Sequence, residues 1–315
     1  MTPSFRVFRL CLISLLAVIP AALLQAQTSW KGRDGDWDEV KNWSKPALPP
    51  LQVVAPVKKT APNAKPAAPV PVAPKPGAAA SIAAPAAAVL KPLPLPSPIT
   101  PATPNVVVLG GGLVTWHADR QGDFSLEVPM LMTKKAGWKQ TGGPSWIFVR
   151  NGGSLTITDA VFDGGTSENF IVGETVPGHV LVSGPDASLA MPEGEIKLRR
   201  NATFTVQSGH VSAKLISFDD MAEGSQAILT LAGGTLTLTG NGYGGVYGGD
   251  EHHFINFPTG SKAVLVLTAI ESEGVYEQLE KGGIRYNQRI NPAAFKVEPR
   301  EGSGCRITID PLATP

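Results

Sequence analysis

The chain has 315 residues, of which 27 are Lys or Arg and 26 are Asp or Glu, so its formal charge is +1. Removal of a leader that contains Arg6 and Arg9 would leave 25 basic and 26 acidic residues, a charge of about −1. A nearly neutral chain gives no electrostatic reason to expect binding to nucleic acid or to an anionic membrane surface.

Residues 1–27 have the three-part organisation of a secretory signal peptide. Arg6 and Arg9 precede an apolar run over 10–24, and small or polar residues close the stretch around Ala26. The run of about 15 residues is shorter than the roughly 20 that span a bilayer, which favours a cleaved signal peptide over a transmembrane anchor. We therefore expect an exported protein (periplasmic, on the cell surface or secreted) with no transmembrane segment after cleavage.

Residues 28–45 contain three tryptophans, Trp30, Trp37 and Trp43. A segment of this length is too short to fold alone. Tryptophans could stack on sugar rings, but the simpler expectation is that the segment caps the open end of a β domain.

Residues 46–104 differ in composition from the rest of the chain. The segment contains 17 prolines, 16 alanines and 5 lysines, and none of its side chains is acidic or aromatic. Such a stretch cannot bury enough apolar surface to offset the entropy lost on ordering, which predicts a disordered linker. It serves either as a spacer or as an insertion that loops out of the β domain, because the cost of an insertion grows only slowly with its length.

Residues 105–312 have the composition and alternation of β-strands. Leu229, Leu231 and Leu236 alternate with threonines, and this period of two places one set of side chains inward and the other outward. One short helix is expected over Val275–Lys281, ended by the two glycines that follow. Only one cysteine, Cys305, follows the leader, so no intramolecular disulfide can form, and a buried inert thiol is expected rather than an intermolecular link.

A repeat of strand, glycine and strand recurs in this region. Apolar residues lie five and three positions before a glycine and two positions after it, at Gly111, Gly209 and Gly234, less closely at Gly153, and with a longer turn at Gly184. Stacked units of this kind bury a continuous core that no single unit could bury alone. The repeat predicts an all-β fold, a parallel β-helix (β-solenoid), with a β-sandwich or jelly roll as the alternative.

Two stretches carry a family resemblance. The first contains W-K-G, G-D-W and N-W-S within 30–44, and the second runs from F-I-N-F at 254–257 to G-I-R-Y-N at 283–287. They resemble the opening and closing segments of large secreted bacterial β-helix proteins of the autotransporter-associated, adhesin-like type. The resemblance implies a parallel β-helix with a structural or adhesive role. Many such proteins end in a membrane barrel or a sorting tail, and this chain ends in neither, so surface anchorage gains no support.

Two groups of side chains in the sequence are candidates for chemistry. The adjacent carboxylates Asp219 and Asp220 would point to opposite faces of a strand, so a solvated turn is the simpler interpretation.

The second group is the densest set of potential ligands in the chain: Asp250, Glu251, His252 and His253. It could form a metal site or a general acid/base pair, but no third ligand group lies at a recognisable spacing, which favours an exposed polar turn. We predict no catalytic residue, metal or cofactor, and we treat these four residues and the three tryptophans of 28–45 as candidate binding residues.

Together these features predict an exported, non-enzymatic structural or adhesion protein of the bacterial envelope or extracellular medium. The expected partner is a cell-wall or extracellular glycan, or an envelope protein. The alternative is a carbohydrate-binding protein or a polysaccharide-active β-helix enzyme. Carboxylates that converge in a groove would favour the enzyme, and a flat Ser/Thr-rich face would favour the structural role.

Overall fold

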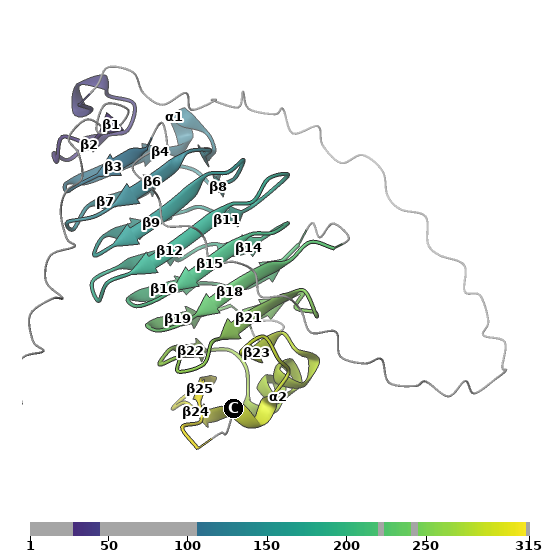
Figure 1. The fold of residues 1–315 in the computed structure, drawn as a ribbon. Coiled ribbons are helices and arrows are strands. Elements are labelled where there is room, and N and C mark those ends of the chain that lie inside the picture. Colours follow the sequence, from purple (N-terminus) through teal and green to yellow (C-terminus); the bar gives the residue numbers. More distant parts are fainter. Residues whose placement is uncertain (1–27, 45–105, 220–223, 241–244, 313–315) are drawn as a thin grey trace, which may run out of the picture.

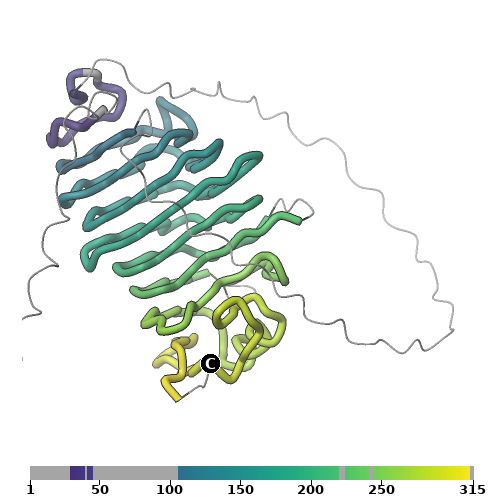
Figure 2. Tube along the Cα trace, viewed as in Figure 1, coloured from purple at the N-terminus to yellow at the C-terminus, as the bar shows by residue number. Residues whose placement is uncertain are grey.

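A computed structural model describes residues 28–44, 106–219, 224–240 and 245–312. Within these ranges the chain winds into a β-solenoid of about seven turns. Strands of neighbouring turns pair in parallel, which confirms the predicted parallel β-helix over the sandwich alternative. Figure 1 shows the turns stacked along one axis, and Figure 2 follows the chain from the purple end of the stack to the yellow end. The predicted linker at 46–104 and the leader at 1–27 lie outside the described residues.

The described strands form three sheets. In order across it, the nine-stranded sheet contains β1 (Thr28–Ser29), β3 (Val107–Leu109), β6 (Pro129–Met132), β9 (Ser154–Thr158), β12 (His179–Ser183), β15 (Thr203–Val206), β18 (Ala227–Leu231), β21 (His253–Phe257) and β23 (Ile284–Tyr286). The ten-stranded sheet contains β2 (Gly35–Asp36), β4 (Leu113–His117), β7 (Gly137–Thr141), β10 (Val161–Asp163), β13 (Ser188–Met191), β16 (His210–Ala213), β19 (Thr235–Leu238), β22 (Val264–Leu267), β25 (Cys305–Ile309) and β24 (Phe295–Pro299). The six-stranded sheet contains β5 (Phe124–Leu126), β8 (Trp146–Val149), β11 (Asn169–Val172), β14 (Glu195–Leu198), β17 (Ile216–Phe218) and β20 (Val246–Tyr247).

Equivalent positions of successive central turns recur at intervals of 24 or 25 along the chain, as the contacts of Thr158 with Ser183 and of His179 with Thr203 show. Leu155, Val180, Phe204 and Leu229 are paired in register on successive strands of the nine-stranded sheet. All four side chains point into the core and are buried, as the alternation predicted.

The corners between the nine-stranded and ten-stranded sheets require left-handed backbone. Gly209 has φ +82°, and a Cβ there would lie 2.3 Å from the carbonyl oxygen of Ala187. At two other corners the left-handed position is taken by Lys135 (φ 61°) and Asp159 (φ 47°), so a search for glycines missed those turns. Gly153 lies between β8 and β9, at a different corner, and its alignment with the other glycines was therefore wrong.

Aromatic side chains stack in the first half of the core. Phe162 is fully buried, stacks on Trp138 with 4.2 Å between ring centroids, and meets Phe170 edge-on at 5.6 Å. Each such contact adds to the free energy gained by removing the rings from water.

Residues 28–44 close one end of the core. β1 pairs with β3 and β2 pairs with β4, although residues 45–105 separate these strands in the sequence. Trp30, Trp37 and Trp43 are buried, with edge-to-face ring contacts at 5.1 and 4.9 Å. Trp43 also donates a hydrogen bond from Nε1 to the carbonyl of Trp37 at 2.9 Å.

The other end is closed by α2 (Ser272–Lys281), the short 3-10 turn η4 (Pro292–Ala294) and the antiparallel pair β24–β25. The helix begins at Ser272, one turn before the predicted start at Val275. It ends as predicted, since the N–H of Gly282, which has a left-handed φ of 81°, donates to the carbonyls of Gln278 and Leu279. Cys305 is buried, as expected of its thiol. Two further short helical turns are η2 (Val40–Asn42) and α1 (Ala118–Gln121).

Candidate functional site

The outer face of the ten-stranded sheet carries mostly small or hydroxyl-bearing side chains. Inward residues such as Leu189, Val211 and Leu236 are buried, so the residues that alternate with them point outward. One outward column, paired in register from strand to strand, is Thr115, Lys139, Asp163, Ala190, Ser212, Thr237 and Val266. The neighbouring column contains Val161, Ser188, His210, Thr235 and Val264.

Hydroxyl-bearing side chains recur on this face. Ser212 and Thr237 place hydroxyl groups on adjacent strands, which in parallel sheets lie about 4.8 Å apart. Its charged side chains include Lys139 and Asp163, which form an ion pair with 3.5 Å between Nζ and Oδ2. Outward hydroxyl groups on successive strands can donate hydrogen bonds to, and accept them from, an extended polymer laid along the solenoid axis.

The predicted cluster at 250–253 forms a turn before β21. Asp250 Oδ1 accepts hydrogen bonds from the backbone N–H groups of His252 (2.7 Å) and His253 (3.0 Å), and it lies 2.7 Å from His253 Nδ1. Burial alone would raise the pKa of Asp250, but these hydrogen bonds from His252 and His253 outweigh it and hold the pKa below its ordinary value. Because these contacts all lie within its own turn, they indicate a structural role for the Asp250 carboxylate.

The four side chains of this turn form two separate pairs: Asp250 contacts His253, and Glu251 Oε1 lies 3.3 Å from His252 Nε2. His253 is buried, at the inward position of β21, whereas Glu251 is exposed. Arg285 fixes the turn to β23: it donates from Nη2 to the carbonyl of Asp250 at 3.0 Å and lies 4.3 Å from the ring centroid of Phe254. Among the described residues, no group of three or more His, Cys, Asp or Glu side chains could hold a metal ion.

Asp219 lies at the end of β17 on the outer face of the six-stranded sheet, while Asp220 falls outside the described residues. Asp219 accepts hydrogen bonds from Arg199 Nε (2.7 Å) and Nη2 (3.3 Å). Lys197 Nζ lies 3.7 Å away. The carboxylate is held between two cations from the preceding turn, an arrangement that stabilises the stack.

Ion pairs between an arginine and carboxylates of neighbouring turns also occur nearer the N-terminal end of the six-stranded sheet. Arg150 contacts both Glu127 (3.2 Å) and Glu174 (2.7 Å), which come from turns on either side of it. Each of these carboxylates is therefore engaged by a guanidinium that belongs to another turn.

The tryptophans considered for sugar stacking, Trp30, Trp37 and Trp43, are 5, 1 and 2 % exposed. Their rings contact one another and the end of the core, so no ring face is open to a sugar in the folded chain. Trp146, on the outer face of the six-stranded sheet, is the exposed tryptophan of the described residues, at 38 %.

Sequence reasoning missed a chain of contacts that joins three turns. His117 Nε2 lies 2.9 Å from Asp36 Oδ1, and His117 Nδ1 lies 3.0 Å from Thr141 Oγ1. Arg120 donates to the other Asp36 oxygen at 3.1 Å. Hydrogen bonds from His117 and Arg120 hold the pKa of Asp36 below its usual value.

Carboxylate, imidazole and hydroxyl occur in this order in the triads of hydrolases. Here they span β2, β4 and β7, and Arg120 also binds the carboxylate, so the contacts tie residues 28–44 to the first turns. Asp36 and His117 are 81 positions apart in the sequence, and His117 and Thr141 are 24 positions apart, so no local motif could reveal these contacts.

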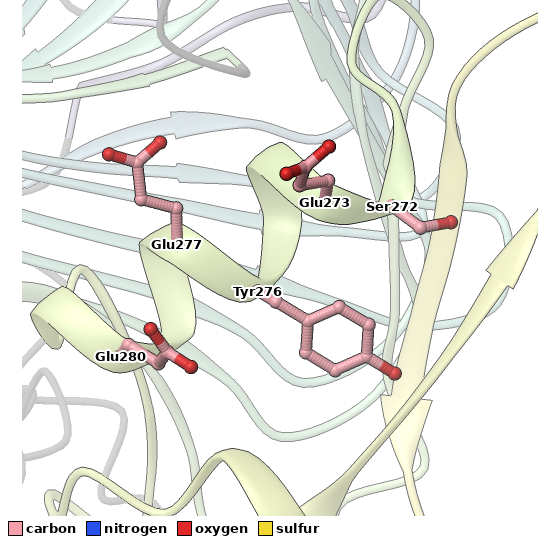
Figure 3. A pocket seen from close by; sticks show the side chains of 5 residues that line it. All are labelled: Ser272, Glu273, Tyr276, Glu277 and Glu280. Carbon is pink, nitrogen blue, oxygen red and sulfur yellow. The ribbon is translucent and has the colours of Figure 1, made fainter.

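A depression in the surface beside α2 is lined by Ser272, Glu273, Tyr276, Glu277 and Glu280. Figure 3 shows the three carboxylates spread along the helix at separate positions. Glu277 is paired with Lys281 one turn along. The arrangement is that of a solvent-facing helix surface, and it presents no convergent set of groups.

No protein-family model, curated protein or solved structure matches the chain. Within the described ranges, no helix is both long and apolar enough to cross a membrane.

Proposed function

We propose that this chain is an exported, non-enzymatic structural or adhesion protein that binds an extended glycan through the outer face of its ten-stranded sheet. The observation that carries the proposal is the column of small and hydroxyl-bearing side chains on that face, Ala190, Ser212 and Thr237, in register on three successive strands. Such a surface suits contact with a repeating polymer over many weak sites, each of which contributes little alone.

The contacts of the acidic side chains favour binding over catalysis. Asp219, Glu127 and Glu174 pair with arginines, and Asp250 is engaged by the backbone of its own turn. A general acid or nucleophile must instead be directed at a substrate.

Export and an envelope or extracellular location rest on the sequence. The three-part pattern of residues 1–27 supports secretion, and the resemblance to autotransporter-associated, adhesin-like β-helix proteins supports an adhesive or structural role. N-terminal sequencing of the protein recovered from outside the cytoplasm tests the leader directly, since it should begin near Thr28. A mature protein that still begins at Met1 would refute cleavage.

The binding surface is tested by co-sedimentation of the purified mature chain with insoluble cell-wall and extracellular glycans. Thr237→Glu places a bulky charge in the hydroxyl-bearing part of the proposed surface, beside Ser212, and binding should fall at least about fivefold, roughly 1 kcal/mol. Thr230→Glu is the matched control, because Thr230 is also an outward, half-buried threonine of the same turn but lies on the nine-stranded sheet. Equal binding by both variants and the wild type would refute the assignment to this face.

A further inference from the structure

The outer face of the six-stranded sheet has buried apolar residues that do not belong to the core. Ile147, Val149, Phe170 and Val172 point inward and join the core cluster. Phe148 and Ile171 alternate with them and therefore point outward, yet they are only 8 and 1 % exposed and are not part of that cluster.

These two residues belong to one outward column. In register from strand to strand, the column is Ser125, Phe148, Ile171, Lys197, Ser217 and Tyr247. Beside it, Oδ1 of Asn169 is buried and has no hydrogen-bond partner among the described residues. The Arg150 guanidinium covers part of the Phe148 ring, with 4.6 Å from Cζ to the ring centroid. The burial of Ile171 next to a buried, unpaired acceptor indicates that a further segment covers this part of the face.

The topology shows which part of the chain arrives at this face. In each complete turn the chain reaches the nine-stranded sheet from the six-stranded sheet, as β6 follows β5 and β9 follows β8. β3 runs parallel to β6, so its first residue lies at the same corner. Val106, the first described residue after the linker, therefore lies at the corner beside β5, the edge strand of the six-stranded sheet.

The chain that ends at this corner is suited to cover the column. Residues 89–104 read V-L-K-P-L-P-L-P-S-P-I-T-P-A-T-P, with four apolar Val, Leu or Ile side chains after position 89, namely Leu90, Leu93, Leu95 and Ile99, and no acidic residue. The stretch contains six prolines, which lack an N–H, so an extended chain laid on the sheet buries few donors that need partners.

The length of residues 89–104 is also sufficient to cross the face. From β5 to β17 the column crosses four strand spacings, about 19 Å at about 4.8 Å each. An extended proline-rich chain covers that distance in roughly six residues at about 3.1 Å per residue. Trp146, at the border of the column and partly exposed, provides the kind of aromatic surface on which proline-rich segments dock.

We propose that residues 89–104 of the same chain dock across the outer face of the six-stranded sheet and cover Phe148 and Ile171. The linker is then anchored to the solenoid at its C-terminal part, and only the part before residue 89 is free to act as a spacer. This face is consequently closed to external partners, whereas the ten-stranded face stays open.

The test uses the full mature chain with the photo-crosslinking amino acid benzoylphenylalanine in place of Trp146. Irradiation should join this position to a peptide within 89–104 of the same chain, and the yield should be unchanged by tenfold dilution. The matched control places the crosslinker at Val161, which is exposed on the outer face of the ten-stranded sheet and should not give this product.

A second variant replaces Leu93, Leu95 and Ile99 by serine. These residues lie outside the described solenoid, so the fold should persist by circular dichroism while the crosslink yield falls at least about fivefold. Crosslinks that join two chains, or that capture added glycan in place of 89–104, would assign the face to another occupant and overturn the proposal. So would crosslinking to 89–104 that is equally efficient from position 161.

Discussion

Replacement of Phe162 by alanine tests the inward and outward assignment at the centre of the solenoid. Phe162 is fully buried, and its ring contacts those of Trp138 and Phe170. Loss of a buried phenylalanine costs about 3–5 kcal/mol. Since each aromatic pair is worth about 0.5–1.5 kcal/mol beyond burial, we expect the upper half of that range, about 4 kcal/mol. With a urea slope of about 2–3 kcal/mol per molar, the unfolding midpoint should fall by roughly 1.3–2 M.

The assay is urea unfolding followed by circular dichroism and by tryptophan fluorescence, with Val161→Ala as the control. Val161 precedes Phe162 on β10 and is 47 % exposed, so its truncation should change the free energy of unfolding by less than about 0.5 kcal/mol. Because solenoid turns contact only their neighbours, the transition that includes β10 is the one to compare if unfolding occurs in steps. A loss below about 1 kcal/mol for Phe162→Ala, or equal losses for both variants, would refute the reasoning.

Three further predictions concern the corners, pH and the linker. Gly209→Val should prevent or strongly impair folding, because valine disfavours the left-handed φ and its Cβ would lie 2.3 Å from a carbonyl oxygen. Gly143→Val is the control and should be tolerated, because a Cβ there would have no atom within 4 Å. Soluble yield and thermal melting compare the two variants. Burial lowers the pKa of His179 below 6.5, so the unfolded chain binds its proton more readily, and stability should be highest above pH 6.5 and decrease as the pH falls below it. Urea midpoints across that range should depend less on pH in His179→Gln, and an unchanged dependence would contradict this. Trypsin should cut the linker after Lys58 or Lys59, because the other lysines of the linker each precede a proline. After this cut, residues 28–44 should stay bound to the solenoid on gel filtration, and their release would refute the cap.

Much of the fold could be predicted because a solenoid repeats one local rule. The alternation at Leu229 and Leu231 identified the inward face, and the separation of Gly209 from Gly234 matches the interval of 25 positions between paired strands elsewhere in the stack. Other turns escaped notice because Lys135 and Asp159 adopt the left-handed conformation that glycine adopts elsewhere. A pattern based on glycine alone therefore identifies only some of the turns.

The candidate binding residues were less predictable, because their environment depends on contacts between turns. Trp43 and Trp146 look alike in the sequence, but Trp43 is buried within the cap formed by residues 28–44, whereas Trp146 is partly exposed on an outer face. The contact between Asp36 and His117 joins residues 81 positions apart. The cluster at 250–253 is a turn, as the sequence favoured, but the prediction that it is exposed was wrong for His253, which is buried. The hydrogen bonds of Asp250 to the backbone of its neighbours could not be predicted from spacing alone.

The most direct test of the central claim is to incubate the purified mature chain with an insoluble glycan that it retains, and to assay the bound and soluble fractions of that sample together. The account predicts saturable binding that Thr237→Glu weakens and Thr230→Glu does not, with no soluble glycan fragments released. Release of fragments would contradict the non-enzymatic assignment, and binding that is indifferent to Thr237 would contradict the assignment of the ten-stranded face.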